Sequence, residues 1–487
     1  MYHNFPYSTP EAQGVPSAAI AKWIRRIRSL EYIHSFMLLR HGHVIAEAWT
    51  DPYQPEFKHR LFSTTKSFTS AAIGFAMAEK RLTLDDKIVS FFPEAKDWNV
   101  SDKMKTVTIR NLLTMSSGHN TCAICTYLDN DGDPARKLKN WVKGFLESPL
   151  VFEPGTKFCY NSGCSYMLSA ILRKITDLNL MEYLQPRLFA PLGIEPGERE
   201  TCPMDIDIGG WGMKLRTADL AKYGQLLLQK GKWNGKQILP WEYFELATSK
   251  QISNAPENPQ PVTDPEYICP DWEQGYGFQF WRCQNNSYRA DGAFGQYIVV
   301  MPDQDMVLVA TSGLVNMQRI LTATWELILP ELKERAITDN FCAQAEVASL
   351  CRSLHMPLQQ GDLTKRGEDA TYEFEENSLK IRSCNVSFQE DSCEFVFHTA
   401  SAPEKLSAGF GYWKFSFCKF DDFETTRYAS SAAWNEQGEL ELTVCKVETP
   451  FFTRIRFVFD DDKLTIHEKT VRRFRTADWP VLHATKK

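Results

Sequence analysis

Apolar residues recur along the first two thirds of the chain in two alternating patterns. Helical spacing of three and four residues marks positions 20–30, 167–172 and 220–227. Strand-like runs occupy 34–40 and 43–49, separated only by His41-Gly42, and three more follow at 276–281, 296–301 and 306–310. We therefore expect an antiparallel sheet made from both ends of a domain, with helices on its faces and in an inserted lobe.

The pattern changes after about residue 335. We expect a first domain over 1–335, a linker over 336–365 and an all-β accessory domain over 366–487, built from alternating runs such as 393–397 and 440–444. The alternation leaves open whether this module is a barrel or a sandwich. The aromatic residues of one segment are interpreted as core residues: Trp413, Phe415, Phe417, Phe420 and Phe423. The module is expected to cover part of a catalytic cleft or to mediate oligomer contacts.

Composition narrows the class of protein. A chain of 487 residues with 43% hydrophobic residues, 24% charged residues and a net charge of -6 is typical of a soluble protein of two or three domains. It contains no basic run typical of nucleic-acid binding and no apolar stretch of membrane-spanning length. The first residues do not resemble a signal peptide, so we expect a cytoplasmic location.

Thirteen scattered cysteines favour reduced thiols over a disulfide framework. Cys122 and Cys125 have the spacing of a redox or zinc pair but lack companion ligands, so a loop with two free thiols is favoured. The acidic stretch 129–133 lacks the downstream glutamate of a calcium loop and is interpreted as solvated. No metal or organic cofactor is expected.

The candidate chemistry begins at Ser63 and Lys66, which precede an apolar helical series starting at Ala71. Residues three apart lie on one helix face, so the hydroxyl and the amine can be hydrogen-bond neighbours. The amine can act as a base only if its pKa falls from roughly 10.4. The alternative is a helix-capping serine with an exposed lysine. A second copy of this spacing, Ser416 to Lys419, lies in a strand-like run and is interpreted as chance.

Two further motifs give the serine a context. Tyr160-Asn161-Ser162 follows a Pro-Gly turn, and Ala290-Asp291-Gly292 precedes the run at 296–301. With Ser63 and Lys66, these resemble the ordered motifs of the serine β-lactamase and penicillin-binding-protein superfamily, in its class C-like branch of esterases, D-amino-acid-specific peptidases and 6-aminohexanoate-dimer hydrolases. The resemblance covers roughly residues 8–335, including Gly209-Gly210-Trp211. It implies an α+β, β-lactamase/transpeptidase-like fold.

The resemblance also implies roles for single residues. Ser63 would attack a carbonyl to form an acyl-enzyme, and Lys66 and Tyr160 would share the proton transfers, with the base left open between them. The backbone N–H groups of Ser63 and Ala293 would form the oxyanion hole after Gly292. Trp211 would line the cleft, unless it is a core residue.

Alternatives remain for two of these groups. Tyr160 could be a buried structural aromatic. Arg289 and Asp291 could form an exposed ion pair that contributes little.

Two departures from the family pattern bear on the substrate. Ser162 replaces the more common asparagine, and Ala290 stands where a cationic or imidazole side chain often meets a substrate carboxylate. We therefore expect a serine hydrolase of the esterase, amidase or peptidase type, acting on a small ester or amide, with weak or no β-lactamase activity. Asp291 is a hypothetical contact for an amine-bearing substrate. The alternative is a catalytically impaired binding or sensor protein. The expected partner is a small molecule, with no nucleic acid or membrane, and a homo-oligomer is left open.

Overall fold

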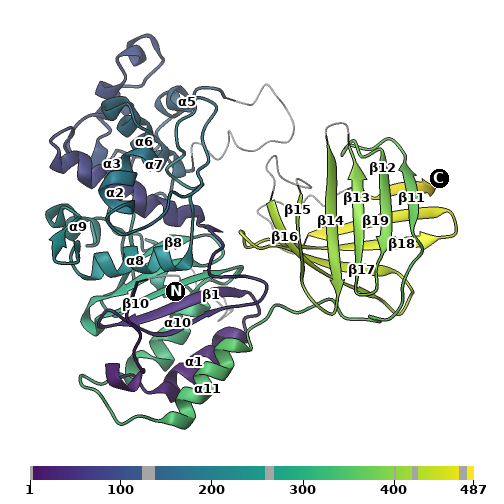
Figure 1. Ribbon diagram of the computed structural model, residues 1–487. Coiled ribbons are helices and arrows are strands. Elements are labelled where there is room, and N and C mark those ends of the chain that lie inside the picture. The colour runs from purple at the N-terminus through teal and green to yellow at the C-terminus, as the bar shows by residue number, and fades with distance from the viewer. Residues whose placement is uncertain (1–3, 123–137, 258–267, 400–401, 419–425, 471–479) are drawn as a thin grey trace. The chain divides into compact units, whose positions relative to one another are not determined.

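The computed structural model of the protein describes residues 4–122, 138–257, 268–399, 402–418, 426–470 and 480–487 (Figure 1). Its contacts divide the chain into two units. The first comprises Met1–Ala48 and Arg60–Arg352, and the second comprises Trp49–His59 and Ser353–Lys487.

A β-sheet whose strands are not in sequence order forms the centre of the first unit. Its strands follow the order β2-β1-β10-β9-β8-β7, so the N-terminal hairpin lies beside the last strands of the unit. β1 and β10 are antiparallel, with Phe36 opposite Ala310. The strands are β1 (Ile33–Arg40), β2 (His43–Trp49), β7 (Trp281–Arg282), β8 (Tyr288–Gly292), β9 (Gln296–Met301) and β10 (Met306–Ser312). The prediction of one sheet from both ends of the domain is confirmed.

Helices cover both faces of this sheet, and every residue of β1, β8, β9 and β10 is buried as a result. On one face lie α1 (Ser17–Arg28), α10 (Gln318–Leu327) and α11 (Phe341–Arg352) (Figure 1). Trp23 joins them to the sheet, since its ring packs edge-on against Phe36 at 4.9 Å and its Nε1 donates to Thr324 Oγ1 at 3.1 Å. On the other face, α8 (Thr217–Leu228) contacts β9 and β10.

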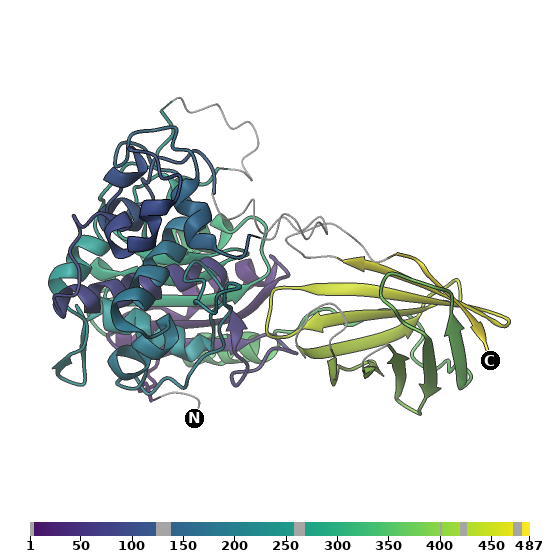
Figure 2. The ribbon, with the colours of Figure 1, turned by 90° about the horizontal axis from the view of Figure 1, so that it is seen from above.

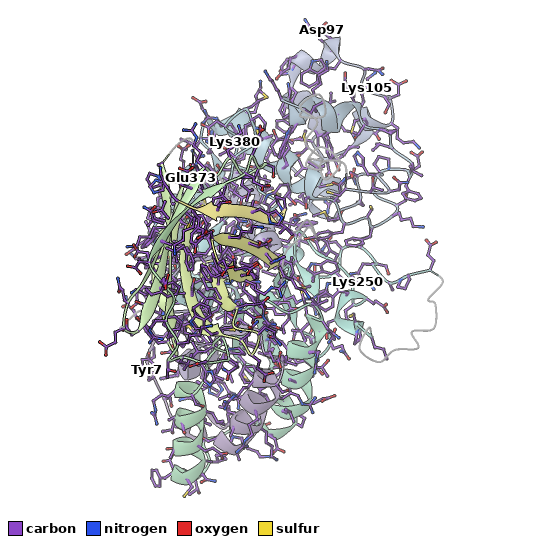
Figure 3. The ribbon with its side chains drawn as sticks, turned by 90° about the vertical axis from the view of Figure 1, so that its right-hand side faces the viewer. Tyr7, Asp97, Lys105, Lys250, Glu373 and Lys380 are labelled. Atoms are coloured by element: carbon purple, nitrogen blue, oxygen red, sulfur yellow. The ribbon has the colours of Figure 1, made fainter. Side chains whose placement is uncertain are left out.

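A helical lobe continues from the α8 face, and seen from above it lies over the strands (Figures 1 and 2). Its central helix α2 is buried from Thr65 to Ala76. A helix with no exposed face must be surrounded by other elements, and here α3, α6, α7 and α9 contact it or its neighbours. The lobe helices are α2 (Thr65–Ala78), α3 (Ile109–Leu113), α5 (Trp141–Glu147), α6 (Ser162–Thr176), α7 (Leu180–Leu184) and α9 (Trp241–Ala247). Asp97 and Lys105 are exposed on the lobe (Figure 3).

Several short elements complete the first unit. They are β3 (His59–Arg60), β4 (Lys214–Leu215), β5 (Lys232–Trp233), β6 (Lys236–Gln237), η1 (Glu11–Gln13), η2 (Phe62–Thr64), η3 (Ile88–Phe91), η4 (Pro93–Asp97), η5 (Met104–Thr106), η7 (Gln185–Phe189), η9 (Pro270–Trp272), η10 (Pro302–Gln304) and η11 (Leu329–Glu331). Of these, η2 and β8 position the candidate site.

The second unit is a closed β-barrel with one additional strand. A single sheet runs β14-β13-β12-β11-β20-β19-β18-β17-β16, and a parallel pairing of β14 with β16 closes the ring. β15 pairs with β16 outside this sequence. The strands are β11 (Ala370–Phe374), β12 (Ser383–Phe388), β13 (Ser392–His398), β14 (Pro403–Phe410), β15 (Lys414–Cys418), β16 (Thr426–Trp434), β17 (Leu440–Lys446), β18 (Phe452–Asp460), β19 (Lys463–Thr470) and β20 (Leu482–Lys486). The predicted fold class is confirmed. The sequence left open whether this module is a barrel or a sandwich, and the structure shows a barrel.

Two local predictions are wrong. Residues 276–280 are not a strand, because Gln279 has a left-handed φ of 64° and a Cβ on Gly277 would lie 2.0 Å from the Ala247 carbonyl oxygen. Phe415 and Phe417 are 39% and 57% exposed instead of lying in the barrel core. Ser416 and Cys418 occupy the buried face of β15 in their place, since side chains alternate along a strand.

The boundaries of the two units differ from the predicted domain limits. α11 lies inside the predicted linker over 336–365, yet it contacts α1 and belongs to the first unit. Residues 49–59 belong to the second unit. The predicted domain limits at 335 and 366 stay predictions.

Cys122 is disulfide-bonded, so the expectation of two free thiols in this loop is wrong for Cys122. Cys125 and the acidic stretch 129–133 lie outside the described residues. The same holds for Lys419 of the second S-x-x-K spacing and for Phe420 and Phe423, interpreted above as core residues. In the part of the chain that the structure describes, no helix is both long enough and apolar enough to cross a membrane.

Candidate active site

Ser63 occupies a tight turn, η2, directly before the buried helix α2. Its predecessor Phe62 has a left-handed φ of 48°, a strained conformation for an aromatic residue. The turn is held on both sides: Leu61 N–H donates to the Met213 carbonyl at 2.9 Å, and Thr64 Oγ1 donates to the Gln296 carbonyl at 2.8 Å. Ser63 itself stays partly exposed. Its hydroxyl is therefore fixed in place and still accessible.

Lys66, one turn further along, is 1% exposed. Its Nζ lies 3.0 Å from Ser63 Oγ, 3.1 Å from Ser162 Oγ and 2.6 Å from the Gly210 carbonyl oxygen. Burial lowers the pKa of Lys66 to about 7, although Cys164 and Asp291 act in the opposite direction. A neutral amine has two N–H donors and one lone pair, and these three contacts can use all of them. The lone pair would then accept the proton of Ser63.

The Gly210 carbonyl approaches the lysine because two glycines precede Trp211. A Cβ on Gly210 would meet Ser162 O at 3.1 Å and Lys66 Nζ at 3.6 Å. Gly209 has a φ of 67°, and its carbonyl accepts from Thr69 Oγ1 at 2.7 Å. The Gly-Gly-Trp stretch is recognisable in the sequence, but the contact of the Gly210 carbonyl with Lys66 was not predicted from it. The adjacent glycines were the available signal.

Tyr160 lies next to the amine, with Lys66 Nζ over its ring at 5.0 Å from the centroid. The Tyr160 ring also stacks on Trp281, at a centroid distance of 5.5 Å and an interplanar angle of 30°. Burial raises the pKa of the Tyr160 phenol above its usual range, and the Ser63 side chain partly offsets this effect. Near neutral pH the phenol keeps its proton, whereas the amine of Lys66, with a pKa of about 7, is divided between its charged and neutral forms.

Ser162 reaches Lys66 because it is the first residue of α6. Asn161 caps this helix, with its side-chain oxygen accepting from Gly163 N–H at 2.8 Å. The middle residue of the Tyr-Asn-Ser motif is thus used for the helix start. The two outer residues both face the amine.

The third motif lies on β8, against the turn that carries Ser63. A Cβ on Gly292 would lie 2.1 Å from the Leu61 carbonyl oxygen and 2.8 Å from Thr64 Oγ1, so only glycine permits this approach. Ala293 follows directly and is partly exposed. The end of β8 and the serine turn are therefore adjacent. Ala290 is 1% exposed and brings no charge to the site.

Asp291 and Arg289 form a buried ion pair, with Arg289 Nε 2.7 Å from Asp291 Oδ2 and side-chain exposures of 0% and 6%. The interpretation of an exposed pair is wrong, since neighbouring strands and helices cover both faces of β8. Burial raises the pKa of Asp291, while Arg289 and Lys66 act against this rise.

Trp211 is partly exposed and donates from Nε1 to Glu200 Oε2 at 3.1 Å. Its ring lies 6.3 Å from that of Trp141, on α5. Trp211 is thus next to the Gly210 carbonyl along the chain, with its side chain directed to the α5 side.

The family model described as Beta-lactamase matches residues 11–329. The chain belongs to the beta-lactamase family. Its match covers the sheet, the lobe and all of the residues described above. The family assignment supports the serine β-lactamase and penicillin-binding-protein superfamily inferred from the motifs.

Individual relatives of the family are distant. A beta-lactamase of Escherichia coli (strain K12) is 22% identical over 332 residues, covering 56% of this chain and 81% of that protein. A 6-aminohexanoate-dimer hydrolase of Paenarthrobacter ureafaciens is 24% identical over 301 residues, covering 57% of this chain and 72% of that protein. Among solved structures, a Bacillus anthracis protein described as a 6-aminohexanoate-dimer hydrolase has a TM-score of 0.52 and 20% identity, covering 66% of this chain and 86% of that one. Family and relatives together indicate a hydrolase of the β-lactamase type.

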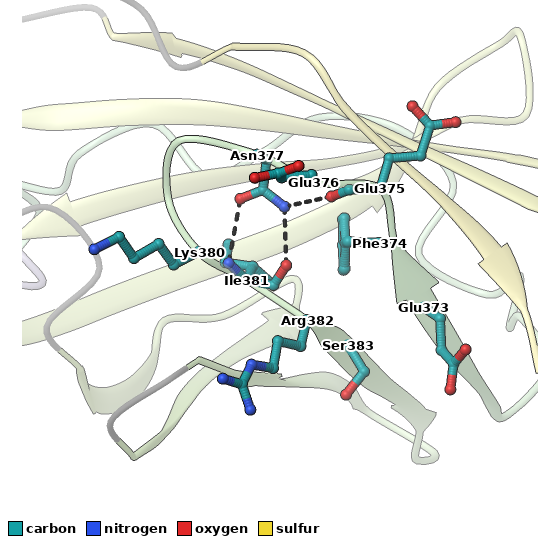
Figure 4. Close-up of a pocket in the computed structure, with 9 residues that line it drawn as sticks. All are labelled: Glu373, Phe374, Glu375, Glu376, Asn377, Lys380, Ile381, Arg382 and Ser383. Carbon is teal, nitrogen blue, oxygen red and sulfur yellow. Dashed lines mark hydrogen bonds between the residues drawn. The ribbon is translucent and has the colours of Figure 1, made fainter.

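A separate cavity of about 500 Å³ lies in the second unit, around the connection from β11 to β12 (Figure 4). Asn377 shapes it, donating to the carbonyls of Glu375 and Ile381, each at 2.8 Å. Glu373 and Lys380 at its edge are both labelled in Figure 3. The cavity contains none of the family-site residues. Within the described ranges, no three His, Cys, Asp or Glu side chains are arranged to hold a metal ion.

Proposed function

We propose that the protein is a serine hydrolase that acts on small esters or amides through an acyl-enzyme at Ser63. One observation carries this proposal: a buried Lys66 amine with a pKa of about 7 lies 3.0 Å from the partly exposed Ser63 hydroxyl. An adjacent neutral base is what a serine needs to become a nucleophile near neutral pH. Membership of a family of serine hydrolases supports the same assignment.

In the first step, Ser63 Oγ bonds to the substrate carbonyl carbon while its proton passes to Lys66 Nζ. The N–H groups of Ser63 and Ala293 receive the developing negative charge on the carbonyl oxygen. The bond to the leaving group then breaks, and Tyr160 supplies its proton, which Lys66 restores. Water hydrolyses the acyl-enzyme by the same route in reverse order. Lys66 is assigned as the base because its pKa is lowered, whereas that of Tyr160 is raised.

The surroundings of β8 favour uncharged substrates. A β-lactam carries a carboxylate, and Ala290 offers no cation for it, while Arg289 is completely buried and paired. Asp291 Oδ2 already accepts from Arg289, which also weakens the case for an amine-bearing substrate. Values of kcat/KM for matched substrates with and without an amine, in wild type and Asp291→Asn, test this point; a preference for the amine that Asp291→Asn abolishes would contradict it.

The test of the proposed function is intact-protein mass spectrometry after exposure to a fluorophosphonate, p-nitrophenyl acetate or a penicillin, with Ser63→Ala as control. We expect an adduct that Ser63→Ala abolishes, and ester turnover without efficient penicillin turnover. The absence of any adduct on Ser63 would overturn the proposal. A stable adduct without turnover would instead support the sensor alternative. The cytoplasmic location and a homo-oligomeric state remain predictions.

A further inference from the structure

The guanidinium of Arg289 is the least expected charge in the first unit, because the residue is completely buried. Its Nε donates to Asp291, and its Nη1 donates to the Asp271 carbonyl at 2.7 Å and to Cys283 Sγ at 3.1 Å. A buried charge is retained at a cost unless it is paired and hydrogen-bonded. These bonds fix the plane of the guanidinium relative to β7, β8 and η9.

The guanidinium lies over two aromatic rings. The guanidinium carbon lies 4.2 Å from the Trp272 ring centroid and 5.5 Å from that of Trp281. Trp281 and Arg289 are direct cross-strand partners on β7 and β8. The position of the Trp281 ring is therefore coupled to that of Arg289.

The ring of Trp281 in turn stacks against the ring of Tyr160. Tyr160 lies in the irregular segment before α6, outside any helix or strand, so its backbone is not fixed by a regular hydrogen-bond ladder. Tyr276 also contacts the Tyr160 ring edge-on at 6.5 Å, and Phe158 packs against both Tyr276 and Trp281. The stack runs from Arg289 through Trp281 and Tyr160 to Lys66.

We propose that Arg289 is a positioning residue for Tyr160, holding the phenol next to Ser63 and Lys66 through the ring of Trp281, with Asp291 as the counter-ion that fixes the guanidinium. The proposal rests on the proposed function, in which Tyr160 donates a proton to the leaving group. An arginine suits this task better than a lysine, because a planar guanidinium both stacks and keeps several directed hydrogen bonds.

The test compares two esters in which the need for that proton differs. Ethyl acetate loses an alkoxide that must be protonated, whereas p-nitrophenyl acetate loses a stable anion. In Arg289→Lys we expect kcat/KM to fall roughly ten- to a hundredfold for ethyl acetate and much less for p-nitrophenyl acetate. A purely structural defect would lower both values equally.

Three further variants distinguish the effect of the stacked Trp281 ring from that of the Arg289 charge. Trp281→Leu should reproduce the loss, and Trp281→Phe should retain most of the activity because a ring remains between Arg289 and Tyr160. In the double variant Arg289→Lys/Trp281→Leu, the combined loss should be smaller than the product of the single losses. Arg282→Lys is the matched control, since the Arg282 side chain bonds to Thr248 and Asn286 outside the stack.

Equal losses for both esters, or multiplying losses in the double variant, would overturn the proposal. If Arg289→Lys does not fold, the comparison of Trp281→Leu with Trp281→Phe decides alone. Crystal structures of wild type and Arg289→Lys provide a readout independent of turnover. An unchanged Tyr160 ring position in the variant would contradict the positioning role even if Ser63 proved not to be the nucleophile, whereas failure of the fluorophosphonate to label wild-type Ser63 would overturn only the proposed function.

Discussion

The burial of Lys66 has two opposite consequences. Removing the amine from water disfavours its charged form, which makes it a base near neutral pH. The same desolvation makes the folded state less stable wherever the unfolded chain would bind the proton. The three oxygen neighbours of Nζ reduce this cost without removing it. A reactive side chain is thus maintained by the stability of the surrounding lobe.

Ester hydrolysis should depend on pH through Lys66. Because the folded pKa is about 7, kcat/KM for p-nitrophenyl acetate should rise as pH increases through about 7 and then level off. Initial rates between about pH 5 and about pH 9 check this. Lys66→Arg, which keeps the positive charge, should lose at least roughly a hundredfold in kcat/KM. A profile without any change across this range would exclude Lys66 as the base.

The free energy of unfolding should also depend on pH through Lys66, and the direction of this dependence can be predicted. Between a folded pKa of about 7 and an unfolded value of 10.5, the unfolded chain binds more protons, so stability rises with pH in this window. Relative to Lys66→Met, wild type should gain roughly 2–3 kcal/mol of unfolding free energy from about pH 6 to about pH 9. Urea unfolding of both proteins across this range measures the difference. Parallel pH dependence in the two would show that the amine stays charged when folded.

At the scale of elements, the site depends on how closely β8 approaches η2. Gly292 permits the contact, and Phe62 and Phe294 meet across it with ring centroids 5.7 Å apart. Both phenylalanines have left-handed φ values, 48° and 66°. Two strained aromatic positions next to the proposed oxyanion hole indicate that the surrounding structure imposes this geometry.

Replacing Gly292 with alanine should separate the two elements. The new Cβ would overlap the Leu61 carbonyl, so we expect a loss of roughly 1–3 kcal/mol of stability and roughly a hundredfold decrease in kcat. Urea unfolding and ester kinetics measure both effects. Gly193→Ala is the control: a Cβ there has nothing within 4 Å, and its φ of 61° should cost only about 1 kcal/mol with unchanged turnover. Wild-type kcat in Gly292→Ala would show that the approach is not needed for chemistry.

Local sequence spacing accounts for part of this site and not for the rest. The pairing of Ser63 with Lys66 follows from helical geometry, and the motifs led to Tyr160 and Ser162. The contact of the Gly210 carbonyl with Lys66 and the stack on Trp281 depend on chain segments brought together by folding. The burial of Arg289 was missed for the same reason. An Arg-x-Asp pattern on a strand is compatible with either an exposed or a buried pair, and only the folded structure shows that both faces of the sheet are covered.

For the whole molecule, all proposed site residues belong to the first unit, whereas residues 49–59 belong to the second although the first surrounds them in sequence. Alternation predicted the β-module, but the barrel is closed by the parallel pair β14–β16, a register that alternation does not encode. Likewise, only long-range contacts assign residues 49–59 to the second unit. Phe57 packs on Phe415 with ring centroids 5.9 Å apart, and the Arg427 guanidinium lies 4.1 Å from the Phe57 ring centroid. The chain therefore enters the second unit twice.

This double entry leads to a prediction about stability. Tyr53 is 5% exposed, and its hydroxyl donates to the Thr449 carbonyl at 3.4 Å within the second unit. Tyr53→Ala should therefore destabilise the barrel by roughly 3 kcal/mol and lower its melting temperature by several degrees, although the residue lies between two strands of the first unit in sequence. Calorimetry follows the transitions, and fluorophosphonate labelling of Ser63 during heating identifies the one that belongs to the first unit. If Tyr53→Ala shifts the loss of labelling and leaves the other transition unchanged, residues 49–59 stabilise the first unit instead, and the division of the chain must be redrawn.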